Sequence, residues 1–301
     1  MAQSIPFGSR STADQVLAGI DLSRKRVLVT GCNSAIGLET MKALSANGAA
    51  IIGVARTLDE AEAACSVVGR SSIPLGCDPT DPRSVDAAVE SLRRLSGPLD
   101  AVIVNPPELQ CFADHIAQFA LVNRLAEFVR HGTGRIVIAG SDPSMPDAPL
   151  ESVMSGDLDG ERMYDSHAFR GQGMLATALF AKELSRRLEA TGVAVNAFHS
   201  ATGIPDSRDS QPVARRLIRP LLRFFTRSPA QHAATPALLA ASPLAARITG
   251  EYWSNCRISR GSPSVADAGL AKRFWDISSQ IAATMFGHDQ SPRTGAPRHT
   301  F

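Results

Sequence analysis

Short runs of apolar residues alternate with helical patterns along most of the chain, and this alternation constrains the fold more than any other feature. Continuous apolar runs are typical of strands buried on both faces, in a parallel sheet that helices cover on either side. The sequence therefore predicts a doubly wound α/β fold. The expected strands cover residues 26–30, 50–55, 73–76, 100–104, 135–139 and 193–198.

Capping signals place helices between these strands. Thr57 is followed three residues later by Glu60, which is a capping box. Asp81 precedes Pro82, and this pair is an N-cap with proline at the first helical position of a helix that reaches about Leu95. The remaining helices are expected over residues 35–47, 111–131 and 166–190, from Ser228 onward, and over 265–285.

The length of 301 residues fits a single domain of this kind, because no internal repeat and no linker divides the chain. We expect the domain to cover residues 25–286, with residues 1–24 as an N-terminal extension that packs on it. Residues 287–301 are polar and rich in helix breakers, which predicts a disordered tail.

Charge and apolar content narrow the classes of function. The 31 lysines and arginines nearly balance 29 acidic residues, and a net charge of +2 does not indicate a nucleic-acid partner. No apolar run is long enough for a transmembrane segment, and the N-terminus lacks the apolar core of a signal peptide, so we expect a cytoplasmic protein. Five cysteines without metal-ligand spacing predict buried thiols and no metal site. The oligomeric state stays open.

The turn after the first strand contains two glycines, Gly31 and Gly37, and leads into a helix. Glycines at such a turn let backbone N–H groups approach a pyrophosphate at the positive end of the helix. Ala35 occupies the position of the pattern's middle glycine, and its methyl group narrows that approach. Arg56 ends the second strand and suits the 2′-phosphate of NADP, with a solvated surface arginine as the alternative. These features predict a Rossmann-type domain that binds NADP.

Four stretches, in this order, resemble the short-chain dehydrogenase/reductase family, and most of all its retinol dehydrogenase-like subgroup. They read TGCNSAIGLET, ARTLDEAEAA, CDPTDPRSVDAAV and LDAVIVN. The resemblance implies that Asp78 contacts the adenine and that Asn105 lies beside the adenosine ribose. The cofactor-binding residues that it implies are Gly31, Asn33, Ile36, Gly37, Arg56, Asp78 and Asn105.

The catalytic positions of that family are changed in this chain. The family uses a serine, an asparagine, a tyrosine, and a lysine four residues after the tyrosine. Ser141 keeps the serine, whereas Asp114 stands at the asparagine, Arg170 at the tyrosine and Met174 at the lysine. Arginine stays protonated and cannot shuttle a proton, and methionine supplies no charge. The candidate catalytic residues are therefore Ser141, Arg170 and Asp114, in a degenerate site that does not support the ordinary tyrosine and lysine chemistry.

Three functions are compatible with these residues. By resemblance, the chain is an NADP-dependent oxidoreductase that acts on a small hydrophobic alcohol or carbonyl compound, with His167 or Tyr164 replacing the missing proton donor. The second function is that of a catalytically silent relative that regulates or scaffolds. The third is a non-redox enzyme, an isomerase or cyclase of an apolar metabolite, in which Arg170 stabilises negative charge and Asp114 acts as base. The sequence does not identify the substrate.

Overall fold

The computed structural model places eight strands in one sheet, in the order β3-β2-β1-β4-β5-β6-β7-β8. Strands β1 to β7 pair in parallel, and β8 pairs antiparallel to β7. The strands are β1 (Arg26–Thr30), β2 (Ala50–Ala55), β3 (Ser72–Gly76), β4 (Ala101–Val104), β5 (Arg135–Gly140), β6 (Ala194–His199), β7 (Tyr252–Ser254) and β8 (Arg257–Ile258). The structure describes residues 5–69, 72–106, 112–140, 173–199, 227–259 and 263–287.

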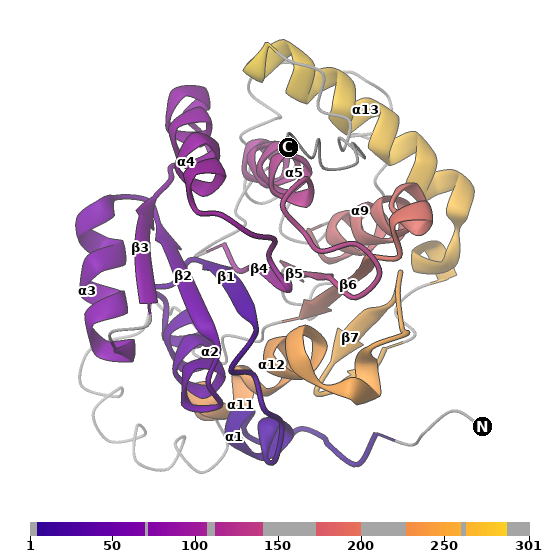
Figure 1. Cartoon of the computed structure of the whole chain (residues 1–301). Helices are drawn as coiled ribbons and strands as arrows, with labels where there is room; N and C mark the ends of the chain where they lie inside the picture. The colour runs from indigo at the N-terminus through magenta and orange to yellow at the C-terminus, as the bar shows by residue number, and fades with distance from the viewer. Residues whose placement is uncertain are drawn as a thin grey trace, which may run out of the picture.

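Helices cover both faces of the sheet (Figure 1), which confirms the predicted doubly wound, single-domain α/β fold. One face carries α4 (Pro82–Arg94), α5 (Phe112–Ala126), α9 (Gly173–Arg187) and α13 (Ala268–Phe286). The other face carries α1 (Ala13–Leu17), α2 (Ala35–Ala46), α3 (Leu58–Val68) and α12 (Ala234–Ala241). The short helix α11 (Pro229–His232) lies against α1 and α2. The described residues also form 3-10 turns at Glu189–Thr191, Pro243–Ala245 and Pro263–Ala266.

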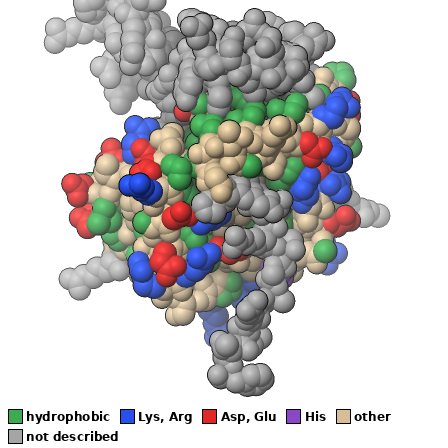
Figure 2. Space-filling view, turned by 90° about the horizontal axis from the view of Figure 1, so that it is seen from above, with side chains coloured by type: hydrophobic (Ala, Val, Ile, Leu, Met, Phe, Trp, Pro, Cys, Tyr) green, Lys and Arg blue, Asp and Glu red, His purple; other side chains and the backbone are tan. Residues whose placement is uncertain are grey.

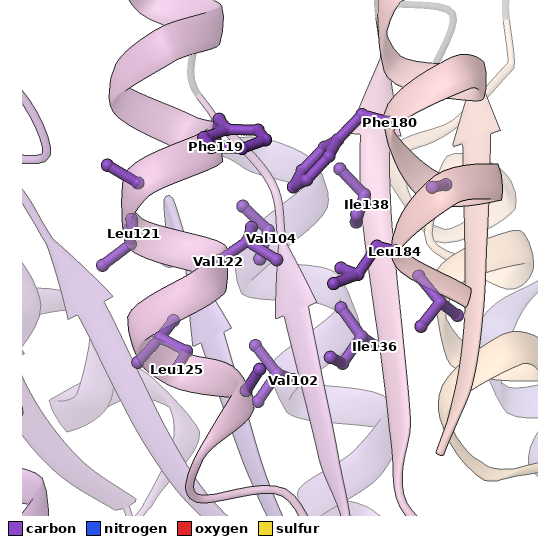
Figure 3. Packing of buried hydrophobic residues seen from close by; sticks show 14 of the residues in the cluster. Val102, Val104, Phe119, Leu121, Val122, Leu125, Ile136, Ile138, Phe180 and Leu184 are labelled. Atoms are coloured by element: carbon purple, nitrogen blue, oxygen red, sulfur yellow. The ribbon is translucent and has the colours of Figure 1, made fainter. Parts of the chain in front are cut away.

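Alternate residues of the central strands face opposite helical layers. Val102 and Val104 of β4 belong to the apolar cluster under α5 and α9, whereas Ala101 and Ile103 belong to the cluster on the other face. Figure 3 shows the first cluster, in which Phe119 of α5 and its neighbours fill the space above β4 and β5. Burial on both faces explains why these strands are continuous apolar runs in the sequence.

The predicted helix starts agree with the structure. Thr57 and Glu60 form both hydrogen bonds of the capping box, and Asp81 caps α4 ahead of Pro82. Ser228 caps a helix as well, but that helix is interrupted at Ala233 and continues as α12. The side chains of Thr57, Asp81 and Ser228 each accept a hydrogen bond from a backbone N–H in the first turn of their helix. Because this contact is local, such residues identify helix starts from the sequence.

One predicted helix end was wrong, and two short strands were missed. The helix expected over residues 111–131 ends at Ala126 in the described chain, because the backbone of Phe128 and Arg130 instead pairs with Leu99. Strands β7 and β8 were not predicted, since they are only three and two residues long. The predicted helix over 166–190 is described only from Gly173, and the predicted disordered tail lies outside the described residues apart from Gly287.

Lysine and arginine side chains are interspersed with aspartate and glutamate on the molecular face shown in Figure 2. That face therefore carries no large area of one charge sign among the described residues. Within the same residues, every helix is too short or too polar to cross a bilayer.

A charged and aromatic contact fastens α13 to α9. Glu183 of α9 is 2 % exposed and accepts hydrogen bonds from Arg186 and Arg187, at 2.7 to 2.9 Å. The Arg187 guanidinium also lies 4.3 Å from the ring centroid of Trp275 on α13, and Trp275 packs on Phe119 of α5. Three helices of one layer are thereby joined.

Asp100 lies at the amino-terminal ends of β1 and β4 and joins several groups there. Its carboxylate accepts hydrogen bonds from the Arg26 amide at 3.0 Å, from Arg130 Nε at 2.9 Å and from Lys25 Nζ at 3.1 Å. Burial alone would raise the pKa of Asp100, but these hydrogen bonds and the Lys25 charge outweigh burial and hold the pKa below its ordinary value. The ionised form of Asp100 therefore stabilises the folded state.

We predict that Asp100→Asn lowers the free energy of unfolding at pH 7 by about 1–2 kcal/mol, because charge-assisted hydrogen bonds are lost. Since the folded-state pKa of Asp100 is lowered, its contribution is present above the unfolded-state pKa and disappears as the pH falls through the folded-state value. Urea unfolding of both proteins should therefore differ at pH 7 and converge in acid. Asp86→Asn, which breaks the exposed pair with Arg124, is the control and should change stability little. Equal stability of Asp100→Asn and the wild type at pH 7 would contradict this role.

Candidate functional site

A reversal of strand order in an open α/β sheet leaves a crevice at the carboxyl edge, and this sheet has such a reversal. The chain moves outward from β1 to β2 and β3 on one side, and from β4 to β5 and β6 on the other, so the direction reverses between β1 and β4. Ligands of open α/β sheets bind at such a switch point. Gly31 follows β1, Arg56 follows β2, Asp78 follows β3 by two residues, and Asn105 follows β4. The structure thus brings these four predicted residues to one edge.

The glycine turn is shaped by contacts within the protein itself. Gly31 has φ +57°, and a side-chain carbon there would overlap the carbonyl oxygen of Asn105. A side-chain carbon at Gly37 would overlap the carbonyl oxygen of Gly31. Both glycines are therefore required for β1, α2 and the end of β4 to approach one another.

Ser34 closes this turn through its hydroxyl group. The hydroxyl donates to the Gly31 carbonyl at 2.7 Å and accepts from the Gly37 amide at 3.0 Å and from Asn105 Nδ2 at 2.9 Å. One donated and two accepted hydrogen bonds use the full capacity of a serine hydroxyl. The backbone N–H of Asn105 in turn donates to Thr30 Oγ1 at 3.0 Å. Ser34 and Thr30 were not predicted to belong to the site, although a serine just before a helix is an N-cap signal.

The residues that face outward at this edge differ from those that support it. Asn33 and Ala35 are exposed at the first turn of α2, next to the positive end of the helix, whereas Ile36 is buried beneath them. Arg56 is exposed, and it makes no ion pair with any residue that the structure describes. Asp78 is half-buried, and its Oδ1 accepts hydrogen bonds from the amide and the hydroxyl of Thr80. The outward groups can meet an anionic ligand at α2 and at Arg56.

The predicted catalytic residues are only partly described. Asp114 is half-buried in the first turn of α5. Ser141 and Arg170 lie outside the described residues, as do the alternative proton donors Tyr164 and His167. Met174 is described: it is half-buried at the start of α9 and packs against the apolar cluster under α5 and α9.

A group of basic side chains near the ends of β6 and β7 was not found from the sequence. His199 ends β6, while Arg227 and His232 belong to the segment around α11. Burial lowers the pKa of His232, and the nearby charges of Arg227 and His199 lower it further. The three residues are 28 and 5 positions apart along the chain, and no motif links them.

Burial makes the described cysteines unreactive. Cys32, Cys65, Cys77 and Cys256 are free and buried, as predicted, while Cys111 lies outside the described residues. Burial raises the pKa of the Cys32 thiol, which lies in the glycine turn, to about 12. A nucleophile needs a thiolate, so Cys32 is a packing residue. Within the described chain, His, Cys, Asp and Glu form no group of three that could hold a metal ion.

Comparisons with known proteins agree with this architecture. The short chain dehydrogenase family matches residues 25–109. A WW domain-containing oxidoreductase of Drosophila melanogaster is 28% identical over 306 residues, covering 94% of this chain and 75% of the relative. Retinol dehydrogenase 14 of Mus musculus is 29% identical over 286 residues and covers 84% of each chain.

Solved structures share the fold at low sequence identity. A protein from Mycobacterium paratuberculosis superposes with a TM-score of 0.64 at 22% identity, covering 90% of this chain and 97% of the other. The actinorhodin polyketide ketoreductase, solved with NADPH, gives a TM-score of 0.55 at 20% identity, covering 77% of this chain and 96% of the other. The chain is thus similar to short chain dehydrogenases over residues 25–109, and to oxidoreductases named as above along most of its length.

Proposed function

We propose that this protein binds NADP in the crevice between β1 and β4 and is an oxidoreductase for a hydrophobic alcohol or carbonyl compound, with an altered catalytic site. The observation that carries the proposal is the row formed by Arg56, Gly31 and Asn105 at the carboxyl ends of three neighbouring strands. Relatives named as an oxidoreductase and a retinol dehydrogenase, and a structural neighbour solved with NADPH, support the same chemistry.

The described residues fit such a cofactor at its adenosine end. The exposed first turn of α2 offers backbone N–H groups to a pyrophosphate, and Arg56 offers an uncommitted guanidinium to a 2′-phosphate. Asp78 and Asn105 would flank the adenine and its ribose, as the family resemblance implies. Ala35 is the one misfit, because its exposed methyl group lies where a glycine would leave more room.

A bound cofactor would supply the hydride to a carbonyl compound, or accept it from an alcohol. The chain must supply or accept the accompanying proton and orient the substrate oxygen. Ser141 is proposed to hold that oxygen, and Arg170 to stabilise negative charge on it. Because Arg170 stays protonated and cannot transfer a proton to or from the substrate oxygen, we assign this transfer to His167 or Tyr164. Asp114 can accept a hydrogen bond beside them but, when ionised, cannot donate one.

One observation favours a second function, that of a cofactor-binding relative without turnover. Met174, at the position of the family's lysine, packs against the apolar cluster instead of presenting a charge. Without that charge, nothing described at this position lowers the pKa of a proton donor or binds the nicotinamide ribose. A regulatory or scaffolding protein would keep the adenosine end and tolerate this loss.

Replacing Arg56 tests the preference for NADP. Arg56→Gln should weaken NADPH binding about 10- to 100-fold, because a charge-assisted contact with the 2′-phosphate is lost, and should leave NADH binding unchanged. Calorimetric titration measures both affinities. Arg94→Gln, at the far end of α4, changes the net charge equally and should have no effect. Equal losses for NADPH and NADH would contradict the assignment of Arg56.

A comparison of ligands tests whether the nicotinamide end is used. NADPH should bind at least tenfold more tightly than adenosine 2′,5′-bisphosphate, since the bisphosphate lacks the nicotinamide half. The same calorimetric titration gives both dissociation constants. Equal affinities would leave only the adenosine end in use and would favour the function without turnover.

The replacement proton donor is tested by substitution. If the protein is an oxidoreductase, His167→Gln or Tyr164→Phe should lower kcat by a factor on the order of 10²–10⁴ while NADPH affinity stays unchanged. Turnover is followed by NADPH absorbance with hydrophobic aldehydes and ketones. If neither substitution changes a measurable kcat, the proton comes from another group and this assignment is wrong.

A further inference from the structure

Three basic side chains, His199, Arg227 and His232, come from segments that lie near the carboxyl ends of β6 and β7. β6 and β7 pair Phe198 with Trp253, and the two strands end one residue later, at His199 and Ser254. Cys256 is two residues further along, and its amide donates to Thr235 Oγ1 at 3.0 Å. Thr235 in turn lies three residues after His232. This chain of contacts brings the end of β6 and the segment around α11 together.

The electrostatic surroundings agree with this placement. The charges of Arg227 and His199 both act on His232 and lower its pKa, after the larger effect of burial. The Arg227 charge also acts on the buried thiol of Cys256, whose pKa burial raises. Arg227 directly precedes Ser228, the N-cap of α11, and its charge affects both His232 and Cys256.

Two of these groups have no counter-charge among the described residues. Arg227 and His232 are half-buried, and in that part of the chain their side chains make neither an ion pair nor a hydrogen bond. A half-buried guanidinium without a counter-charge is unfavourable, and an anion bound beside Arg227 and His232 would offset this cost. The guanidinium fork suits an oxyanion, since it can donate two parallel hydrogen bonds to a carboxylate or a phosphate.

The position of the group relates it to the crevice. β6 lies two strands from β4, on the side away from Arg56. α11 packs on α2, whose first turn opens the crevice (Figure 1). An anion held here would lie on the side of the crevice opposite the proposed 2′-phosphate contact.

We propose that Arg227, His232 and His199 bind an oxyanion, a carboxylate or a phosphate, carried by the substrate. The assignment of this anion to a substrate rests on the proposed function, whereas the anion site itself does not depend on that function. The ligand class is then an amphipathic acid, with an apolar body and one anionic group, in place of a wholly apolar alcohol or carbonyl compound.

Histidine resonances report on the site without any turnover. The pKa of His232 is measured by following its Cε1 proton against pH, assigned with His232→Gln, with and without inorganic phosphate. Phosphate should raise the pKa of His232, because a nearby anion favours the protonated form. No nicotinamide nucleotide is added, so failure of NADP binding and failure of this site are separate results.

Substitution of Arg227 gives the second measurement. Arg227→Gln should weaken phosphate binding at least tenfold and raise the pKa of His232 in the free protein, because a neighbouring positive charge is removed. Arg227→Lys keeps the charge without the fork and should give an intermediate affinity. Arg247→Gln, an exposed arginine outside this group, should change neither quantity.

The source of the oxyanion is tested by measuring the affinities for NADPH and for octanoate, a carboxylate with an apolar chain. A loss of octanoate affinity in Arg227→Gln with unchanged NADPH affinity supports a substrate site. A loss confined to NADPH overturns the substrate assignment, since the group would then contact the cofactor's own phosphates. Absence of any phosphate effect on His232, or equal phosphate affinity in Arg227→Gln and the wild type, overturns the site.

Discussion

The crevice depends on how closely three backbone segments approach one another after β1. Gly31 and Gly37 leave no room for side chains, and the Ser34 hydroxyl joins the turn, α2 and Asn105 with three hydrogen bonds. All of these contacts lie within the protein. A ligand that binds there would find its contact groups already in place, so little conformational entropy would be lost on binding. This preorganisation is the physical basis for placing a nucleotide at the β1–β4 boundary.

The two halves of the proposed site are held differently. At the adenosine end, buried polar groups fix the turn, and exposed groups such as Arg56 face outward. At the other end, Met174 joins the apolar cluster, where the resemblance leads one to expect a lysine. Basic groups near the end of β6 and around α11 lie at the same carboxyl edge, toward the face that carries α2. The groups that we propose for catalysis or anion binding at that end include histidine and arginine side chains.

Sequence patterns predicted the parts of the fold that depend on local chemistry. The capping residues Thr57, Asp81 and Ser228 and the strands of the central sheet were found because each signal lies within a few residues. The end of α5 was misplaced because a long-range pairing with Leu99 competes with helix continuation. The group of Arg227, His232 and His199 had no sequence signal, since only the tertiary fold brings these residues together. The hydrogen bond between Ser34 and Asn105 likewise depends on the tertiary fold, whereas the N-cap role of Ser34 has a local sequence signal.

The Asp100 contacts and the crevice lie at opposite edges of the sheet. Strands of five residues separate them by roughly 15 Å. Substitutions that far apart usually change stability additively, so residues at the carboxyl edge can vary without weakening the contacts at the amino edge. This separation allows a chain to exchange its catalytic groups while the scaffold stays folded. The replacements that the family resemblance implies at positions 114, 170 and 174 would be the kind of change that such a division permits.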